Sequence, residues 1–255
     1  MDDKVLLGSE TAKWWFRNEE FVVACFNDWE NNKMAQEWLV SMWYNIPEID
    51  YVHASKIKGS YKADVQVEIR VEIKLKELVD IQNLQVKLVS NPQGFNQIDK
   101  RWIRNYKELW NIPSDVEKLL KHFTWELPPY ISNPRDARRM FADEFSEEER
   151  SILLNFFEDN KTLIITDILK WRWKFSAEWM LVILNIEWEE MKRALKPMNY
   201  ILNIFGNWPV STTERWSFKI GKITIQRKWW DWWRETANML QFKINPCEIF
   251  NTDES

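Results

Sequence analysis

Glycine is scarce in this chain and tryptophan is abundant, and this pair of counts limits where the backbone can turn tightly. The 255 residues include five glycines and eighteen tryptophans, whereas average usage of about 7% would give roughly eighteen glycines. Glycine is the residue that adopts positive φ without steric cost, in turns and at helix ends. Several tight turns are therefore expected to carry a tryptophan where a glycine would be the physical choice.

The composition is that of a soluble globular protein with a full core. Hydrophobic residues make up 45% and charged residues 29%, and the length fits one large domain or two small ones. The first ten residues show no secretory signal, and the longest apolar stretch, Trp179–Leu184, is too short to span a membrane. Cys25 and Cys247 are expected to be buried, reduced thiols of a cytoplasmic protein. The two histidines, His53 and His122, are too few for a zinc site.

Charge is unevenly placed along the chain. The net charge of −4 argues against a protein that coats nucleic acid uniformly, yet the segments Lys56–Arg104 and Thr212–Lys243 are both basic. Acidic residues gather between Asp143 and Asp159, where Ser146 and Glu149 predict a capping box at the start of a surface helix.

Hydrophobic periodicity predicts a mixture of helices and strands. Two amphipathic helices are expected between Arg17 and Trp43. Alternation of apolar and polar residues predicts a strand over Asp64–Ile73 and a second over Leu84–Val89, which together form a hairpin. A turn cluster, Asn91–Gly94, follows.

The rest of the chain completes an α/β pattern. The expected elements are helices over about Gln97–Trp110 and Ser114–Phe123, buried strands over Lys161–Leu169 and Ala177–Asn185, a helical stretch interrupted by Pro197, and a last strand pair, Phe218–Lys228 and Met239–Ile244. The sum is a mixed central sheet flanked by helices, in a single domain over residues 1–255.

Three polar residues of the predicted hairpin can converge at one edge of the sheet. Asp64 begins one strand, and Gln85 and Lys87 share a face of the next because side chains alternate with period two. An aspartate and a glutamine amide oxygen can bind magnesium, and a lysine can orient or deprotonate water and offset phosphate charge. This set suits metal-assisted hydrolysis of a phosphodiester, although the motif alone also fits an ordinary half-exposed hairpin.

Longer segments carry a resemblance to a known family. They are Gln85–Asn91, Gly94–Lys100, Thr224–Lys228 and Arg234–Lys243. With them, the chain from about Leu7 to Phe250 resembles type II restriction endonucleases that cut GCGC. Those enzymes belong to the PD-(D/E)XK nuclease superfamily, here with glutamine in place of the usual acidic residue.

The resemblance implies a function and a set of site residues. Asp64, Gln85 and Lys87 would be catalytic within a hairpin at about residues 62–90, with Mg²⁺ as cofactor and cleavage that leaves 5′-phosphate and 3′-hydroxyl ends. Glu19 matches a helix-borne acid that lies near the metal in many such nucleases, although a glutamate at a helix N-terminus also stabilises the helix dipole without any catalytic duty. Double-stranded DNA and a protective DNA methyltransferase are the expected partners, and the protein is expected to be a monomer or weak dimer.

DNA recognition is expected in two segments, at about residues 91–104 and 224–243. Polar side chains that can read base edges or hold phosphates, and one aromatic that can wedge between bases, are Phe95, Asn96, Gln97, Lys100, Arg101, Gln226, Arg227, Lys228, Asp231 and Arg234. Without the resemblance, a core Phe95 and a strand end that faces water are the simpler interpretation. Two alternative functions also stay open: a DNA-binding protein of the same fold that does not cut, and a tryptophan-rich carbohydrate-binding module.

The tryptophans fall into two groups when their positions are compared with the matching positions of the resembled enzymes. Glycine occupies the positions that match Trp15, Trp43, Trp125, Trp171, Trp173, Trp216, Trp229, Trp230 and Trp233. Tryptophan occupies those that match Trp29, Trp38, Trp102, Trp110 and Trp179. We therefore hypothesise that the gene uses UGA as a glycine codon and that the translated sequence writes it as tryptophan. The alternative is that the tryptophans are real and stack on bases or sugars.

Overall fold

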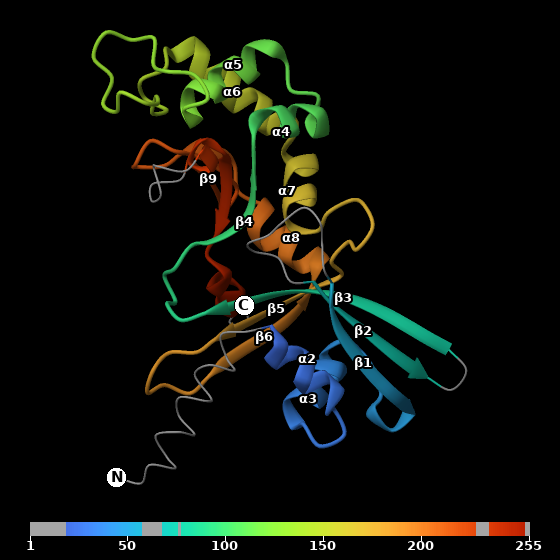
Figure 1. Cartoon of the computed structure of the whole chain (residues 1–255). Helices are drawn as coiled ribbons and strands as arrows, with labels where there is room; N and C mark the ends of the chain where they lie inside the picture. The colour runs from blue at the N-terminus through green and yellow to red at the C-terminus, as the bar shows by residue number, and fades with distance from the viewer. Residues whose placement is uncertain (1–18, 58–67, 76–77, 228–234, 253–255) are drawn as a thin grey trace. The chain divides into compact units, whose positions relative to one another are not determined.

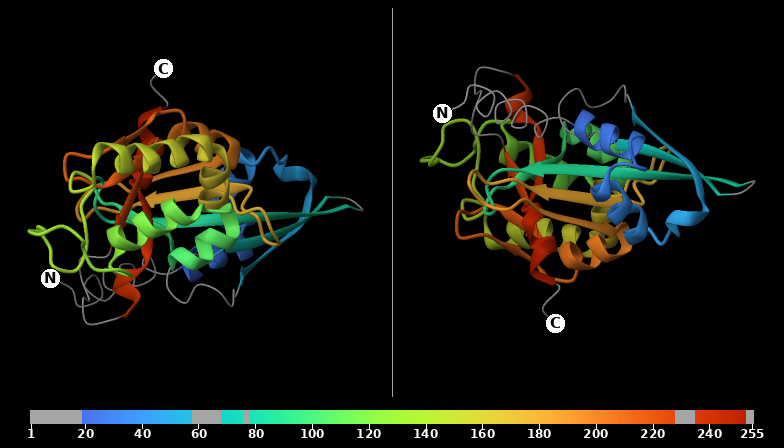
Figure 2. Two further views of the ribbon diagram at one scale, coloured as in Figure 1. Left: turned by 90° about the horizontal axis from the view of Figure 1, so that it is seen from above. Right: turned by 90° about the horizontal axis from the view of Figure 1, so that it is seen from below.

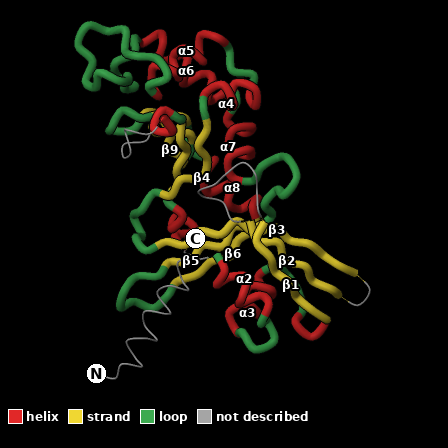
Figure 3. Tube along the Cα trace, in the orientation of Figure 1, coloured by secondary structure: helices red, strands yellow, loops and turns green. Residues whose placement is uncertain are grey.

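The contacts of the chain divide it into two compact units, each with its own sheet (Figure 3). The computed structural model describes residues 19–57, 68–75, 78–227 and 235–252. Unit 1 is assigned residues 1–94, 170–201 and 245–255, and unit 2 is assigned residues 95–169 and 202–244. The α/β class is confirmed, whereas the single domain over residues 1–255 stays a prediction.

Unit 1 contains the mixed sheet that the sequence predicts. Its strands, in spatial order, are β1 (Ile49–Ile57), β2 (Glu68–Leu75), β3 (Leu78–Val89), β5 (Trp179–Leu184) and β6 (Lys192–Pro197). The β3 and β5 strands run parallel, and the other neighbours are antiparallel. The predicted hairpin is present as β2 and β3, in which Glu68 pairs with Gln85. Asp64 lies outside the described residues.

Two short helices cover one face of this sheet, as Figures 1 and 2 show. The predicted pair of amphipathic helices is observed as α2 (Glu20–Asn27) and α3 (Lys33–Ser41). They bury Phe26 and Trp38, whose rings lie 5.3 Å apart, against Leu84 and Val86 of β3. Each large apolar side chain buried in this way contributes about 1.5–3 kcal/mol. The 3₁₀ helices η1 (Ile46–Glu48) and η3 (Pro246–Thr252) also belong to unit 1.

Both cysteines lie in unit 1, and both are buried and free, as predicted. Burial raises the pKa of the Cys25 thiol to about 11. A thiol with so high a pKa stays protonated at neutral pH and is a poor nucleophile. Cys25 therefore packs as a small apolar side chain of the core.

Unit 2 is built on an antiparallel sheet covered by helices. Its strands, in spatial order, are β4 (Asn96–Arg101), β10 (Leu240–Ile244), β9 (Ile223–Arg227), β8 (Phe218–Ile220) and β7 (Val210–Thr212). Its helices are α4 (Ile103–Trp110), α5 (Ser114–Thr124), α6 (Glu147–Asp159), α7 (Lys161–Leu169) and the 3₁₀ helix η2 (Glu235–Asn238). The α8 helix (Met198–Gly206) contributes residues to both units. The predicted capping box is confirmed, since Ser146 Oγ accepts from the Glu149 amide and Glu149 Oε2 accepts from the Ser146 amide.

The predicted helix over Gln97–Trp110 is wrong in its first part. Residues 96–101 form β4, which pairs with β10, and the helix α4 begins only at Ile103. Ile98 and Asp99 are both buried, a pattern that fits neither simple alternation nor a helix face. A register shift opposite Phe242 and Lys243 explains it, because a β-bulge breaks the period of two.

Three further predictions are corrected. The segment Lys161–Leu169 is the helix α7 and not a strand. A short apolar run fits a buried helix as well as a buried strand, and tertiary packing decides between them. The segment before Pro197 is the strand β6, paired with β5, and the helix α8 begins after the proline. The predicted strand Phe218–Lys228 is two strands joined at Gly221, whose φ is +57°.

Seven described residues other than glycine have positive φ, and five of them are tryptophans: Trp43, Trp125, Trp171, Trp188 and Trp216. A side chain at Cβ clashes with the backbone in this region, at a cost of roughly 1–2 kcal/mol per residue. Asparagine, aspartate and histidine are the side chains that tolerate it best. The tryptophans therefore stand where the backbone favours another residue.

Candidate active site and nucleic-acid interface

Gln85 and Lys87 lie on the face of β3 opposite to the helices α2 and α3. Leu84 and Val86 point into the core beneath those helices, and alternation along the strand turns Gln85 and Lys87 to the other face. Both polar side chains are buried, with 2% and 3% of their surface exposed. The structure thus brings together two of the three predicted catalytic residues on the central strand of the sheet.

The amide oxygen of Gln85 has no hydrogen-bond partner among the described residues. A buried acceptor without a donor costs about 1–3 kcal/mol, and a bound water or metal ion would relieve that cost. A neutral amide oxygen is a hard donor atom of the kind that magnesium accepts. Among the described residues, no cluster of three His, Cys, Asp or Glu residues could hold a metal, and Asp64 lies outside them.

Glu19 is the residue before helix α2, and its carboxylate forms an ion pair with Lys56 of β1. The Lys56 Nζ lies 3.7 Å from Glu19 Oε2 and 3.1 Å from Glu20 Oε1. Glu19 makes no side-chain cap of the helix. The ammonium group neutralises part of the charge that would attract a metal, and a ligand role for Glu19 stays a prediction.

Asp80 lies within β3 and is part of a hydrogen-bond network. The Tyr44 hydroxyl donates to Asp80, and Gln82 Nε2 donates to the same carboxylate at 2.9 Å. The Trp179 indole donates to Gln82 Oε1 at 2.7 Å. Burial and the Asp80 charge raise the pKa of Tyr44 well above its usual value. This network joins β3 to residues on the core side, away from Gln85 and Lys87.

The second sheet has one apolar face and one polar face. On the apolar face, Phe242 packs edge-on against Tyr106 and Trp110 of α4, with ring centroids 5.4 Å and 5.7 Å away. Phe218 packs against Phe123 and Phe157 with tilted rings, at centroid distances of 5.2 Å and 5.7 Å. The other face carries amide, hydroxyl and ammonium groups on three adjacent strands.

Cross-strand pairing defines that polar face, because residues directly opposite one another share a face. Lys100, Gln241 and Gln226 are neighbours across three strands, and Gln97, Lys243 and Thr224 are the next set of neighbours on the same face. We call these six residues the polar row. Gln97, Lys100 and Gln226 were predicted for DNA recognition. Thr224, Gln241 and Lys243 share this face and were not among the predicted residues, although the alternation over Leu240–Ile244 already marks Gln241 and Lys243 as one face.

Gln226 is held in a defined orientation within the polar row. Its Nε2 donates to Thr224 Oγ1 at 3.1 Å, and Thr224 Oγ1 in turn donates to the Lys243 carbonyl at 3.3 Å. With the amide nitrogen used in this way, the amide oxygen is the part of the group that can accept from a ligand. The neighbouring Gln241 is buried, and its Nε2 has no hydrogen-bond partner among the described residues.

Arg227 faces the opposite side of the sheet from the polar row. Its guanidinium lies 3.7 Å from the ring centroid of Phe141 and 5.2 Å from that of Phe123, and it donates to the Met140 carbonyl at 2.8 Å. Burial, with a smaller effect of nearby Arg139, lowers the pKa of Arg227 to about 9. These contacts describe a packed structural cation, and base reading by Arg227 stays a prediction.

Arg101 is also engaged within the protein. Its Nε donates to the buried Asp99 carboxylate at 3.1 Å, and Asp99 accepts from the Tyr106 hydroxyl at 2.5 Å. Burial and the Asp99 charge raise the pKa of Tyr106 well above its usual value, so the hydroxyl stays protonated and donates.

Two more of the predicted DNA residues, Phe95 and Asn96, lie at the start of β4. Phe95, directly before β4, is half exposed, which leaves an aromatic ring available to solvent. Asn96 pairs with Ile244 of β10. The other three predicted residues lie outside the described part of the chain: Lys228, Asp231 and Arg234.

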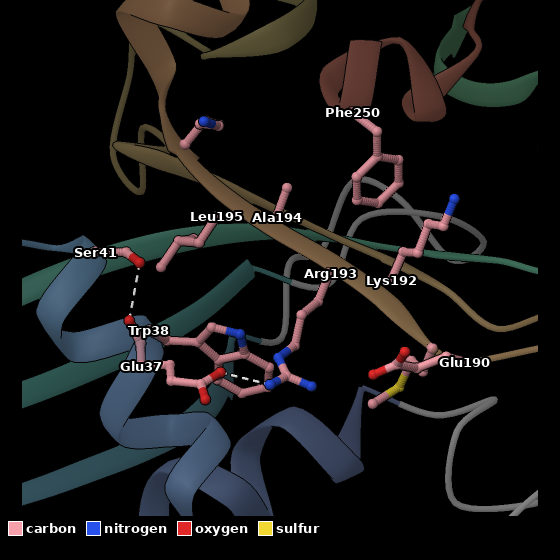
Figure 4. Close-up of a pocket in the computed structure, with 11 residues that line it drawn as sticks. Glu37, Trp38, Ser41, Glu190, Lys192, Arg193, Ala194, Leu195 and Phe250 are labelled. Atoms are coloured by element: carbon pink, nitrogen blue, oxygen red, sulfur yellow. Dashed lines mark hydrogen bonds and ion pairs between the residues drawn. The ribbon is translucent and has the colours of Figure 1, made fainter. Parts of the chain in front are cut away.

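A pocket of about 610 Å³ lies elsewhere in unit 1, between α3, the edge strand β6 and Phe250 of η3 (Figure 4). Arg193 and Glu37 form an ion pair across it. Neither Gln85 nor Lys87 lines this pocket. It is therefore distinct from the predicted catalytic residues.

Comparison with known proteins decides the family. The family model of the R.HinP1I restriction endonuclease matches residues 42–250. The chain belongs to this family. It is accordingly a type II site-specific deoxyribonuclease, as the motifs of the sequence predicted, and the carbohydrate-binding alternative loses its support.

A solved structure shares the fold. The restriction endonuclease MspI, in complex with its cognate DNA, is 12% identical in sequence, with a TM-score of 0.60 over 88% of this chain and 87% of that one. A search of the curated proteins found no significant match. Within the described residues, no helix is both long enough and apolar enough to pass through a membrane.

Proposed function

We propose that this restriction endonuclease hydrolyses double-stranded DNA at GCGC with Mg²⁺ as cofactor and leaves 5′-phosphate and 3′-hydroxyl ends. The observation that carries the proposal is the buried Gln85 amide oxygen, which lacks a hydrogen-bond donor among the described residues and stands two residues from the buried Lys87. Asp64 precedes Glu68, the residue paired with Gln85, by four positions in the sequence. Asp64 and Gln85 would hold the metal, with Glu19 as a further candidate.

The roles of the residues follow from their chemistry. A divalent metal at such a site supplies Lewis-acid polarisation of the phosphate and makes a water easier to deprotonate. The Lys87 ammonium would orient the attacking water and offset the charge that builds on the phosphate oxygens. Burial strengthens both effects because charges interact more strongly away from water.

The polar row would read the DNA. Phosphate contacts position a duplex, whereas hydrogen bonds to base edges specify its sequence. The free acceptor of Gln226 suits a donor such as the exocyclic amine of cytosine in the major groove. Lys100 would hold a phosphate or a guanine edge beside it. A DNA methyltransferase that modifies the same site would protect the host.

Digestion of unmethylated plasmid DNA tests the proposal. We expect discrete fragments in the presence of Mg²⁺, with ends that map to GCGC, and none in excess EDTA or on plasmid methylated at GCGC. Discrete fragments that map to another sequence would contradict the specificity alone. Salt-dependent binding without cutting would favour the non-cutting DNA-binding alternative.

Replacement of Gln226 by alanine tests the recognition surface. We expect cleavage of GCGC sites to fall by about 5- to 150-fold, because one base contact contributes about 1–3 kcal/mol of discrimination. Cleavage of sites altered at one base should fall less, so that specificity relaxes. The measurement is kcat/KM on matched duplexes, with Ser211→Ala on β7 of the same sheet as the control. An equal loss on all duplexes would contradict base reading and indicate a phosphate contact or a packing role.

A further inference from the structure

Trp43 occupies a helix end that is built for glycine. It follows α3 at φ +69°, its amide donates to the Val40 carbonyl at 2.9 Å, and the Tyr44 amide donates to the Leu39 carbonyl at 3.0 Å. These two bonds, around a residue in the left-handed region, are those of a Schellman motif, whose left-handed position is usually glycine. The Trp43 side chain is meanwhile 77% exposed.

Two more helices end in the same way. Trp125 directly follows α5 in the left-handed conformation, at φ +81° and ψ +13°. Trp171 follows α7 by one residue at φ +70°. Three helices of one chain thus end on a tryptophan with positive φ, although glycine is the residue that ends helices in this conformation without a steric cost.

The other two tryptophans with positive φ stand in tight turns. The Glu189 amide donates to the Ile186 carbonyl at 3.2 Å, which places Trp188 at the third position of a β-turn with φ +72°. Turns with positive φ at that position require glycine or asparagine. Trp216, at φ +56°, closes the turn between β7 and β8, where its amide donates to the Thr213 carbonyl. Trp188 is 96% exposed, so no packing contact compensates for the strain.

A second group of tryptophans behaves as real tryptophan. Trp38, Trp110 and Trp179 are buried, and none is among the described residues with positive φ. The Trp110 indole donates to Asp167 at 3.0 Å and stacks on Tyr106, and the Trp179 indole donates to Gln82. Backbone conformation and burial therefore separate the two groups without reference to any other protein.

We propose that Trp43, Trp125, Trp171, Trp188 and Trp216 are glycines in the working protein, because the gene encodes them by UGA codons that its host reads as glycine. The structure adds Trp188 to the positions that the sequence suggested. The same codon would turn the segment between β9 and η2, which carries Trp229, Trp230, Trp232 and Trp233, into a glycine-rich segment within the region proposed to contact DNA. Glycine lets a backbone approach a ligand closely. The inference does not depend on the proposed cleavage specificity.

The gene and the native protein provide the first test. We expect UGA codons at the five positions and UGG codons at Trp38, Trp110 and Trp179. Mass spectrometry of protein from the original host should then find glycine in the peptides that contain residues 43, 125 and 188. UGG codons at the five positions, or tryptophan in those peptides, would overturn the proposal.

Stability provides a second test that needs no native host. A variant with Trp→Gly at the five positions is expected to have a Tm roughly 10 °C above that of the chain as written, because each change relieves backbone strain. The matched controls are Trp38→Gly, Trp110→Gly and Trp179→Gly, each of which should lower Tm because a buried ring is lost. A five-site variant with an unchanged or lower Tm would contradict the proposal.

Discussion

A Lys87→Met variant is expected to lose about 100- to 10,000-fold of its DNA cleavage rate and to keep its fold. Lys87 is buried and follows Gln85 by two residues on the central strand β3. Methionine keeps the length and most of the apolar stem and removes only the charge and the hydrogen-bond donors. Loss of a group that acts on the nucleophile or the developing charge typically costs 10²–10⁴-fold in rate.

Stability separates this catalytic role from a structural one. Burial of an ammonium group costs free energy that a methionine does not, and loss of the interactions that Lys87 makes offsets that gain, so Lys87→Met should keep a cooperative unfolding transition in urea. Single-turnover cleavage with enzyme in excess measures the rate, and urea unfolding measures the stability. Lys192→Met, at an exposed position on β6 of the same unit, is the control and should cut normally. Wild-type cleavage by Lys87→Met would remove Lys87 from the active site.

The sequence predicted the strand that carries Gln85 and Lys87 well because its signals are local. Alternation in the hairpin determines the register, and the same alternation places Gln85 and Lys87 on one face with no need for tertiary information. The helices α2 and α3 were likewise predicted from their apolar stripes. Each of these elements has a pattern that permits only one type of structure.

The misassigned elements lack such a pattern. The apolar run of α7 fits a buried helix as well as a buried strand, and β4 contains a bulge that conceals its alternation. The side chains that share the polar face of the second sheet were harder still to predict. Arg227 is charged and close to the polar row in sequence, yet its guanidinium packs on Phe141. Alternation along β10 marks the face of Gln241, but its neighbours Lys100 and Gln226 follow only from the position of β10 between β4 and β9.

Asp99→Ala is expected to lower the free energy of unfolding by about 3 kcal/mol. The Asp99 carboxylate is buried and accepts from the Tyr106 hydroxyl at 2.5 Å and from Arg101 Nε at 3.1 Å. Its removal leaves a buried hydroxyl without this acceptor and a guanidinium without its partner. Breaking a buried pair from one side costs about 3–5 kcal/mol, and the partial exposure of Arg101 reduces that cost because water can solvate it.

A comparison with Tyr106→Phe apportions this loss between the two partners. That change removes one hydroxyl and keeps the ring stacked on Trp110 at 4.5 Å, so about 1 kcal/mol is expected. The losses of unfolding free energy in the two single variants should add up to more than the loss in the double variant, because both single changes break the same hydrogen bond. Urea unfolding of the four proteins gives the coupling energy. A loss below about 1 kcal/mol for Asp99→Ala would show that Asp99 does not anchor Arg101 and Tyr106.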